Sequence, residues 1–205
     1  MKSLYKIGVL LLFINTIGCS TMFLNGEIKN NTYIAKNNMF TIMIPQENGS
    51  YEFKYMKVKE QYEQSHAYVS FGPAAFDQSI YRVEFTKKPT HINKTVTIEK
   101  AAPAAISPYK KQLLETYGTE LIEIESKKLK INNNNAYYWK FTQNIPIGKH
   151  MSNSSTIFTH YAYVIDYNIG AGVIWVQIPK DSENRDPIPP LKFAHSLKIM
   201  PNKRL

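Results

Sequence analysis

Alternation of apolar and polar residues with a period of two is the feature that most limits how this chain can fold. It is clear at Tyr51, Phe53 and Tyr55, and again at Tyr137, Trp139 and Phe141. A strand sends successive side chains to opposite faces, so this spacing fits strands and not helices. Such alternation is typical of antiparallel sheets that bury one face. The chain must therefore cover at least one apolar sheet face.

Two groups of predicted strands stand on either side of one predicted helix. The first group comprises residues 40–44, 51–58, 67–71 and 80–85, and the second comprises residues 121–131, 136–145, 156–167 and 173–178. The segments 132–135 and 168–172 are predicted turns, because Asn and Gly tolerate the positive backbone angles that tight hairpins require. Both groups are expected to form antiparallel runs.

The predicted helix lies between the two strand groups. Ser107 is its expected N-cap, Pro108 its first residue, and Gly118 follows its end. An apolar stripe at helical spacing is expected to face the core rather than a cofactor. The stripe comprises Ile106, Tyr109, Leu113, Leu114 and Tyr117.

The composition of the chain and the absence of a linker or repeat favour one globular domain. The 205 residues are 43% hydrophobic and 20% charged, and they contain no internal repeat or second-domain linker. We expect an α+β fold in residues 38–200, with an antiparallel sheet packed against a few helices. A short helix at 191–195 would follow, residues 197–199 would add a final strand or pack beneath the sheet, and 201–205 would be a tail.

The N-terminus has the parts of an export signal. Lys2 and Lys6 precede an eleven-residue apolar segment at 7–17, and small residues follow it. A membrane-spanning helix is the alternative, but eleven residues reach only about 16 Å and a bilayer core needs about 20 residues. Residues 1–18 are therefore predicted to be a signal peptide.

The segment Thr16-Ile17-Gly18-Cys19-Ser20 resembles the lipobox of bacterial lipoproteins. The resemblance implies that Cys19 is acylated and becomes the first residue of a membrane-anchored mature chain, with residues 19–37 as a flexible tether. Thr16 departs from the Leu usual in that family. Ser20 fits the pattern of passage to the outer membrane, where the domain would face the periplasm. The alternative is cleavage after Ser20, which discards Cys19 and releases a secreted factor.

The mature chain is expected to be basic. The net charge of +9 falls to +7 when Lys2 and Lys6 are removed with the signal, leaving 23 basic and 16 acidic residues. Such a charge favours anionic surfaces. The lysines are spread along the chain without a run of five, which instead favours an ordinary solvated surface.

Three segments resemble the fold shared by PsbP, the Ran-binding Mog-type proteins and the envelope lipoprotein DcrB. They are the opening strand at 40–45, the strand and turn leading from Leu129 to Tyr138, and the closing helix at 193–199. The resemblance covers about Met39 to Met200. It implies an α/β sandwich and, by analogy, a binding or accessory role.

Motifs that would mark catalysis or cofactor binding are missing from the sequence. There is no G-x-S-x-G, H-E-x-x-H or phosphate-binding glycine loop. We therefore predict no enzyme activity, no metal site and no cofactor. His160 and Asp166 are separated by an even number of residues, so they share one strand face. They would suit a hydrolase of envelope polymers if that face lined a cleft, and a solvent-exposed polar face is the alternative.

Aromatic residues are abundant, with 14 Tyr, 10 Phe and 2 Trp. They could line a groove for a ligand, but strands favour aromatic residues in the core. Export argues against nucleic acid as a partner. The predicted function is a lipid-anchored envelope protein that binds an unknown envelope protein or small ligand, with Cys19 as its attachment to the membrane.

Overall fold

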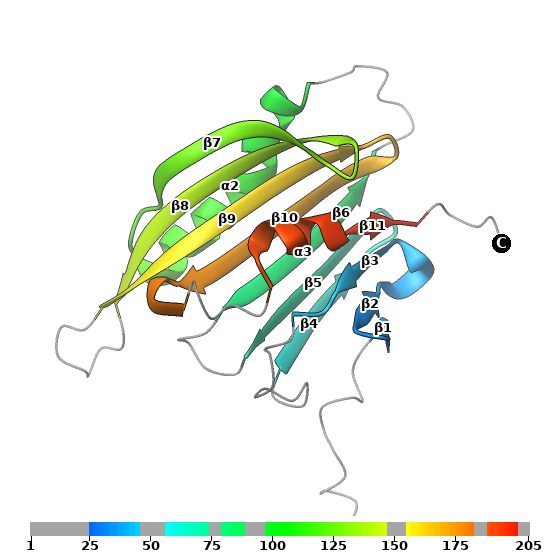
Figure 1. Ribbon diagram of the computed structural model, residues 1–205, viewed down its shortest axis with the longest axis horizontal. Coiled ribbons are helices and arrows are strands. Elements are labelled where there is room, and N and C mark those ends of the chain that lie inside the picture. Colours follow the sequence, from blue (N-terminus) through cyan, green and yellow to red (C-terminus); the bar gives the residue numbers. More distant parts are fainter. Residues whose placement is uncertain are drawn as a thin grey trace, which may run out of the picture.

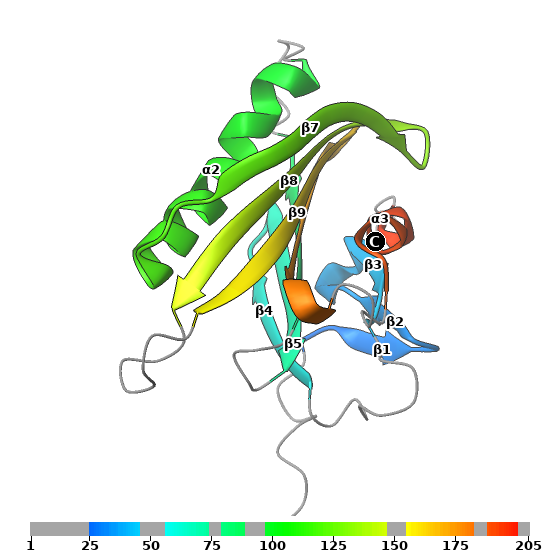
Figure 2. The same cartoon turned by 60° about the vertical axis from the view of Figure 1, so that its left-hand side comes forward.

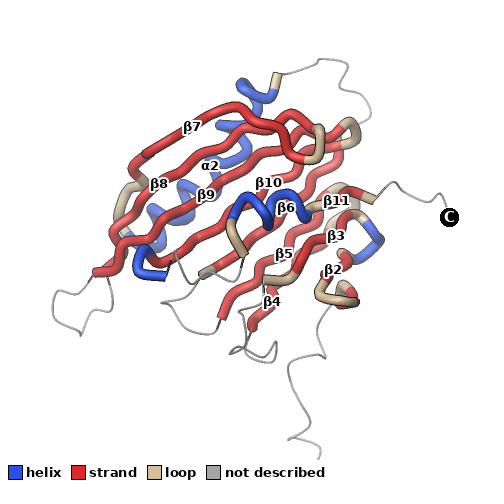
Figure 3. Tube along the Cα trace, in the orientation of Figure 1, coloured by secondary structure: helices blue, strands red, loops and turns tan. Residues whose placement is uncertain are grey.

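The computed structural model describes residues 25–45, 56–73, 79–88, 97–146, 155–182 and 188–200. Two antiparallel sheets and two α-helices make up this part of the chain (Figure 1 and Figure 3). The fold is the predicted α+β sandwich of one domain. The proposed signal peptide, Cys19 and the C-terminal tail lie outside the described residues.

A seven-stranded antiparallel sheet forms the centre of the molecule. It joins the second predicted strand group to the first group without its strand at 40–44, because β6 and β10 pair along most of their length, from Ile80 opposite Gln177 to Lys87 opposite Gly170. In spatial order the strands are β4 (Met56–Tyr62), β5 (His66–Pro73), β6 (Ile80–Lys87), β10 (Gly170–Pro179), β9 (Ser155–Tyr167), β8 (Asn134–Pro146) and β7 (Ile122–Ile131). The predicted strand at 51–58 begins outside the described residues and continues to Tyr62.

A four-stranded sheet lies against one face of the large sheet. It comprises β1 (Glu27–Lys29), β2 (Thr32–Ile34), β3 (Phe40–Met43) and β11 (Lys198–Ile199), with a short 3-10 helix η1 (Lys36–Asn38) before β3. The prediction that the domain begins at residue 38, after a flexible tether at 19–37, is wrong for the end of that tether, because β1 and β2 lie within it. Tyr33 of β2 is fully buried, and this single aromatic residue holds the early strands against the core.

The long helix α2 (Ile98–Tyr117) begins ten residues before the predicted first residue, Pro108. Ser107 and Pro108 are therefore inside it and do not cap it. Pro103 and Pro108 cannot donate amide hydrogen bonds, and the Ala-rich segment 101–105 offsets only part of that cost. Packing of the buried helix face against the sheet supports the rest of the helix. Its predicted end is confirmed, since Gly118 has φ of 70° and its amide donates to the Leu114 carbonyl.

The large sheet is covered on both faces (Figure 2). On one face, α2 buries Ile106, Tyr109 and Leu113 against Trp139 and Trp175. On the other, the small sheet and α3 (Pro190–Ser196) pack over the second and larger apolar core. The 3-10 helix η3 (Lys180–Ser182) follows β10. The alternation in the sequence does not show whether a sheet is covered on one face or, as here, on both faces.

The Glu60 carboxylate connects the two sheets at the N-terminal end of the described chain. It accepts hydrogen bonds from the amides of Asn25 at 2.5 Å and Gly26 at 2.9 Å. The hydroxyls of Tyr33 and Tyr62 also donate to it. The segment that leads toward Cys19 is thus fixed to β4 from Asn25 onward.

Candidate functional site

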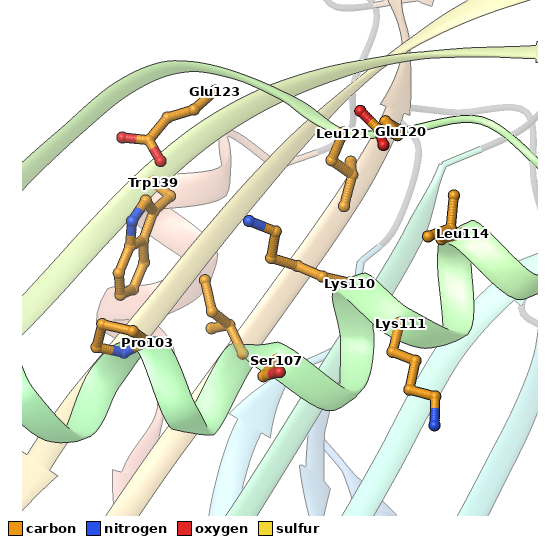
Figure 4. Close-up of a pocket in the computed structure, with 10 residues that line it drawn as sticks. Pro103, Ser107, Lys110, Lys111, Leu114, Glu120, Leu121, Glu123 and Trp139 are labelled. Carbon is orange, nitrogen blue, oxygen red and sulfur yellow. The ribbon is translucent and has the colours of Figure 1, made fainter.

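A groove of about 640 Å³ lies between α2 and the start of β7, and we term it the α2–β7 groove (Figure 4). Its volume is within the usual range of small-molecule sites. The helix contributes Pro103, Ile106, Ser107, Lys110, Lys111 and Leu114 to its lining. The opposite side is formed by Glu120, Leu121, Glu123 and Trp139.

The groove exists because α2 packs over β8 and β9 and not over the edge strand β7. The contacts of α2 are concentrated on β8 and β9, so β7 has little helix above it. A bulge between Glu123 and Glu125 bends β7 locally. Leu114 was predicted to face the core, but its side chain remains 43% exposed at this opening.

The charges of the groove are unevenly placed. Lys110 extends from α2 across the groove toward the side of Trp139, whereas Lys111 extends away from β7 (Figure 4). Lys111 is ion-paired with Glu115 at 3.7 Å. Lys110 forms no ion pair with any described residue, and its Nζ lies 5.0 Å from the centre of the Phe141 ring. Phe141 is fully buried and does not line the groove. Its ring belongs to a buried apolar layer beneath Lys110, which we term the floor, and an ammonium group above this layer is suited to an acidic group on an amphipathic ligand.

Stacked aromatic rings support this floor from below. The ring of Trp175 is parallel to that of Tyr109 at 5.5 Å and nearly parallel to that of Phe141 at 5.9 Å. Its indole Nε1 donates a hydrogen bond to Nδ1 of His160. These contacts hold the floor rigid, because each ring is packed on a neighbour that is itself buried.

A buried amide positions the chain that follows α2. Gln143 is fully buried, and its Nε2 donates to the Thr119 carbonyl at 2.8 Å. Thr119 directly precedes the groove residues Glu120 and Leu121. Gln143 therefore fixes one wall of the groove from the interior.

His160 and Asp166 share one face of β9, as predicted, but they do not form a site. Six residues separate them, which places them about 20 Å apart along an extended strand. Asp166 is ion-paired with Lys88 at 3.1 Å. The expectation that this face is exposed is wrong at His160, which α2 and the neighbouring strands bury completely. The opposite row of β9 faces the core at Tyr161, Tyr163 and Ile165.

The other described histidines have structural partners. His66 Nε2 lies 3.0 Å from a Glu84 carboxylate oxygen, and the Tyr109 hydroxyl donates to the other oxygen of Glu84 at 2.5 Å. His195 is on α3, and its Nδ1 lies 3.2 Å from Oδ1 of Asn132 in the turn between β7 and β8. Among the described residues, no three His, Cys, Asp or Glu side chains are grouped closely enough to hold a metal ion. His91 and His150 lie outside the described residues.

The fold has a counterpart among solved structures. Cyanobacterial PsbP from Synechocystis sp. PCC 6803 matches at 10% identity, with a TM-score of 0.52 over 91% of this chain and 99% of that one. The fold is PsbP-like. A protein of Bacteroides thetaiotaomicron matches at 11% identity, with a TM-score of 0.44 over 85% of this chain, which spans about half of that longer protein.

Comparisons of the sequence itself give no match. No family model matches the chain, and no curated protein does so. Of the described helices, none is sufficiently long and apolar to cross a membrane.

The sequence did not indicate the α2–β7 groove. Trp139 was interpreted as a core residue, which is correct since it is 6% exposed, but it also closes one end of the groove. Lys110 was grouped with the solvated surface lysines. The one sequence signal was the adjacent pair Leu113-Leu114, which widens the apolar stripe of the helix. A helix that packs over β8 and β9 alone buries only Leu113 of this pair.

Proposed function

We propose that this chain is a lipid-anchored protein of the bacterial cell envelope that acts by binding and not by catalysis. Its binding site is the α2–β7 groove, and its ligand is a small amphipathic molecule with an apolar body and an acidic group. The observation that carries this proposal is the position of Lys110, a cation without an ion-pair partner among the described residues, above the ring of Phe141.

The shape and chemistry of the groove support this ligand class. Leu114, Leu121 and Trp139 offer apolar surface on both sides of the opening. An apolar lining with a few placed polar groups is the usual composition of a ligand site. Glu120 and Glu123 lie on the β7 side, so the acidic group of the ligand is expected to approach from the helix side, where Lys110 lies.

The anchor follows from the lipobox-like segment at Cys19. Asn25 is the sixth residue after Cys19, and the Glu60 carboxylate holds its amide. Six residues span at most about 20 Å, so a lipidated Cys19 would keep the domain close to the membrane surface. More than one acyl chain is needed for a durable attachment of this kind.

Mass spectrometry of the mature N-terminus tests the anchor. A chain that begins at Cys19 and carries a diacyl or triacyl adduct supports it. A chain that begins at Thr21 without any adduct contradicts it and identifies a released secreted protein. Membrane fractionation of Cys19→Ala alongside the native chain gives an independent readout, since only the native chain should remain with the membrane.

Ligand binding is tested by calorimetry with decanoate and with decanol, which have the same chain length. The proposal predicts that decanoate binds more tightly than decanol and that Lys110→Gln removes the difference. Leu114→Glu should abolish binding of both. The matched control is Leu191→Glu, because Leu191 is also helical and is 47% exposed far from the groove. Equal binding by the two Leu variants would contradict the proposed site.

A further inference from the structure

The strand β7 is an edge of the large sheet, and no described strand pairs with its outer side. Figure 1 shows it as the outermost strand beyond β8. Its residues from 122 to 128 are all exposed, including Ile122 at 64% and Ile124 at 56%. A strand edge with exposed apolar residues is a site where another strand can pair.

The charges of β7 are separated along its length. Glu123 and Glu125 lie in its first half, Ser126 follows, and Lys127 and Lys128 begin its second half. Ile122 in the first half and Leu129 in the second are the corresponding apolar residues. When such a strand pairs antiparallel with an identical one, its acidic half meets the basic half of the other.

The register with β8 assigns each of these charges to a sheet face. Glu123 lies opposite Phe141 and Lys128 lies opposite Tyr137, so both are on the α2 face. Lys128 is ion-paired with Glu99 of α2 at 2.8 Å, and its side chain is 67% exposed, so a second carboxylate can still approach it. Glu125 and Lys127 share the other face, where their own ion pair measures 2.6 Å. The bulge at Ile124 inserts one extra residue, which is why Glu123 and Glu125 lie on opposite faces.

We propose that β7 pairs with β7 of a second copy of this chain, antiparallel, about a two-fold axis at Ser126. A two-fold axis perpendicular to the sheet keeps each face on its own side. Counting past the bulge, Glu125 then faces Lys127 of the second copy, Glu123 faces Lys128, and Ile122 faces Leu129. Every one of these pairs joins residues of the same face, and the two sheets become one continuous sheet.

The opposite strand direction lacks this match. Parallel in-register pairing would place Glu125 beside Glu125 and Lys127 beside Lys127, and like charges directly opposite each other destabilise a sheet. The lysines and the bulge of β7 discourage pairing with arbitrary strands. A second copy of this chain can still pair, because the order of charges along β7 is complementary to itself. This inference is independent of the α2–β7 groove and of the anchor at Cys19.

A cysteine at the axis tests the register directly. In an antiparallel pair, residues that face each other have Cα atoms about 4.5–5.5 Å apart, which a disulfide can bridge. Full-length Ser126→Cys, oxidised with diamide as the acceptor of the two thiol protons and electrons, should give a disulfide-linked dimer. Lys130→Cys is the control, since it does not face itself in this register. Equal cross-linking of the two variants, or none at Ser126→Cys, would overturn the proposed pairing.

Charge exchange tests the proposal without a covalent bond. Sedimentation of the full chain in detergent should show a dimer for the native protein. The variants Glu123→Lys/Glu125→Lys and Lys127→Glu/Lys128→Glu should each raise the dissociation constant at least about tenfold. An equimolar mixture of the two should restore the dimer, which also shows that both variants are folded. Lys192→Glu on α3 is the charge control and should remain dimeric. A monomeric native chain, or a mixture that stays monomeric, would contradict the interface.

Discussion

The indole Nε1 of Trp175 donates a hydrogen bond to Nδ1 of His160 at 3.2 Å, inside the core beneath α2. This bond assigns the imidazole tautomer, because Nδ1 must be unprotonated to accept it. The remaining proton is then on Nε2, which has no hydrogen-bond partner among the described residues. His160 is thus a buried neutral histidine that cannot take up a proton without losing its contact with Trp175.

The stability of the fold should fall as the pH is lowered below about 6.5. Burial lowers the pKa of His160 to about 3, and the positive charge of Arg82 acts in the same direction. Between the ordinary pKa of 6.5 and this value, the unfolded chain binds a proton that the folded chain does not. Each pH unit in that window removes up to about 1.4 kcal/mol of unfolding free energy, and stability above it is unaffected by this group.

The variant His160→Gln isolates this contribution. Glutamine keeps a hydrogen-bond acceptor for Trp175 but does not titrate. Urea unfolding of the native chain and the variant between pH 4 and pH 7.5 should show a steeper loss of stability in the native chain. Parallel pH dependences would show that His160 is not the titrating group.

Loss of the Glu60 carboxylate should release the N-terminal segment from the domain. The substitution Glu60→Ala leaves the amides of Asn25 and Gly26 without their acceptor, which costs on the order of 1–3 kcal/mol for each buried group left unsatisfied. The hydroxyl of Tyr33 loses one of its two partners and keeps that of Tyr62. Limited proteolysis should then cut near residue 25 more rapidly than in the native chain. Glu63→Ala is the control, since that exposed carboxylate only accepts from Gln61. Similar cleavage of both variants would contradict the role of Glu60.

Substitution by alanine should destabilise the fold more at Gly170 than at Gly118. A Cβ at Gly170 would overlap the Thr86 carbonyl and the ring of Phe85, so Gly170→Ala requires the β6–β10 pairing to shift. Gly118 has open space around it, and its alanine variant costs only the left-handed backbone strain of about 1 kcal/mol. Thermal unfolding should show the larger loss at Gly170. A loss at Gly118 that equals or exceeds it would contradict this packing.

Much of the fold could be predicted from local patterns. The strand periodicity and the turn at Asn132-Asn133, where both residues have positive φ, are encoded within a few neighbouring residues. Gly118 ends α2 for the same local reason. The closing helix was also predicted, at 191–195 within the observed Pro190–Ser196, and β11 at Lys198–Ile199 is one of the two arrangements expected for residues 197–199.

What the sequence could not show depends on contacts between distant segments. The burial of His160 requires α2 to lie over β9, and no pattern within β9 indicates that cover. The early strands β1 and β2 are only three residues long and depend on Tyr33 packing against distant residues. The α2–β7 groove arises from the offset between the helix and the sheet edge, which is set by the packing of the whole layer.

The emission of Trp139 is the most direct test that the α2–β7 groove binds a ligand. The chain has only two tryptophans, so Trp175→Phe leaves Trp139 as the single reporter at the end of the groove. Titration of this variant with decanoate should change the emission in a saturable manner. Adding Leu114→Glu should abolish the change, and adding Leu191→Glu should preserve it. An emission that does not change, or that changes equally in the Leu114→Glu background, would contradict a binding role for this groove.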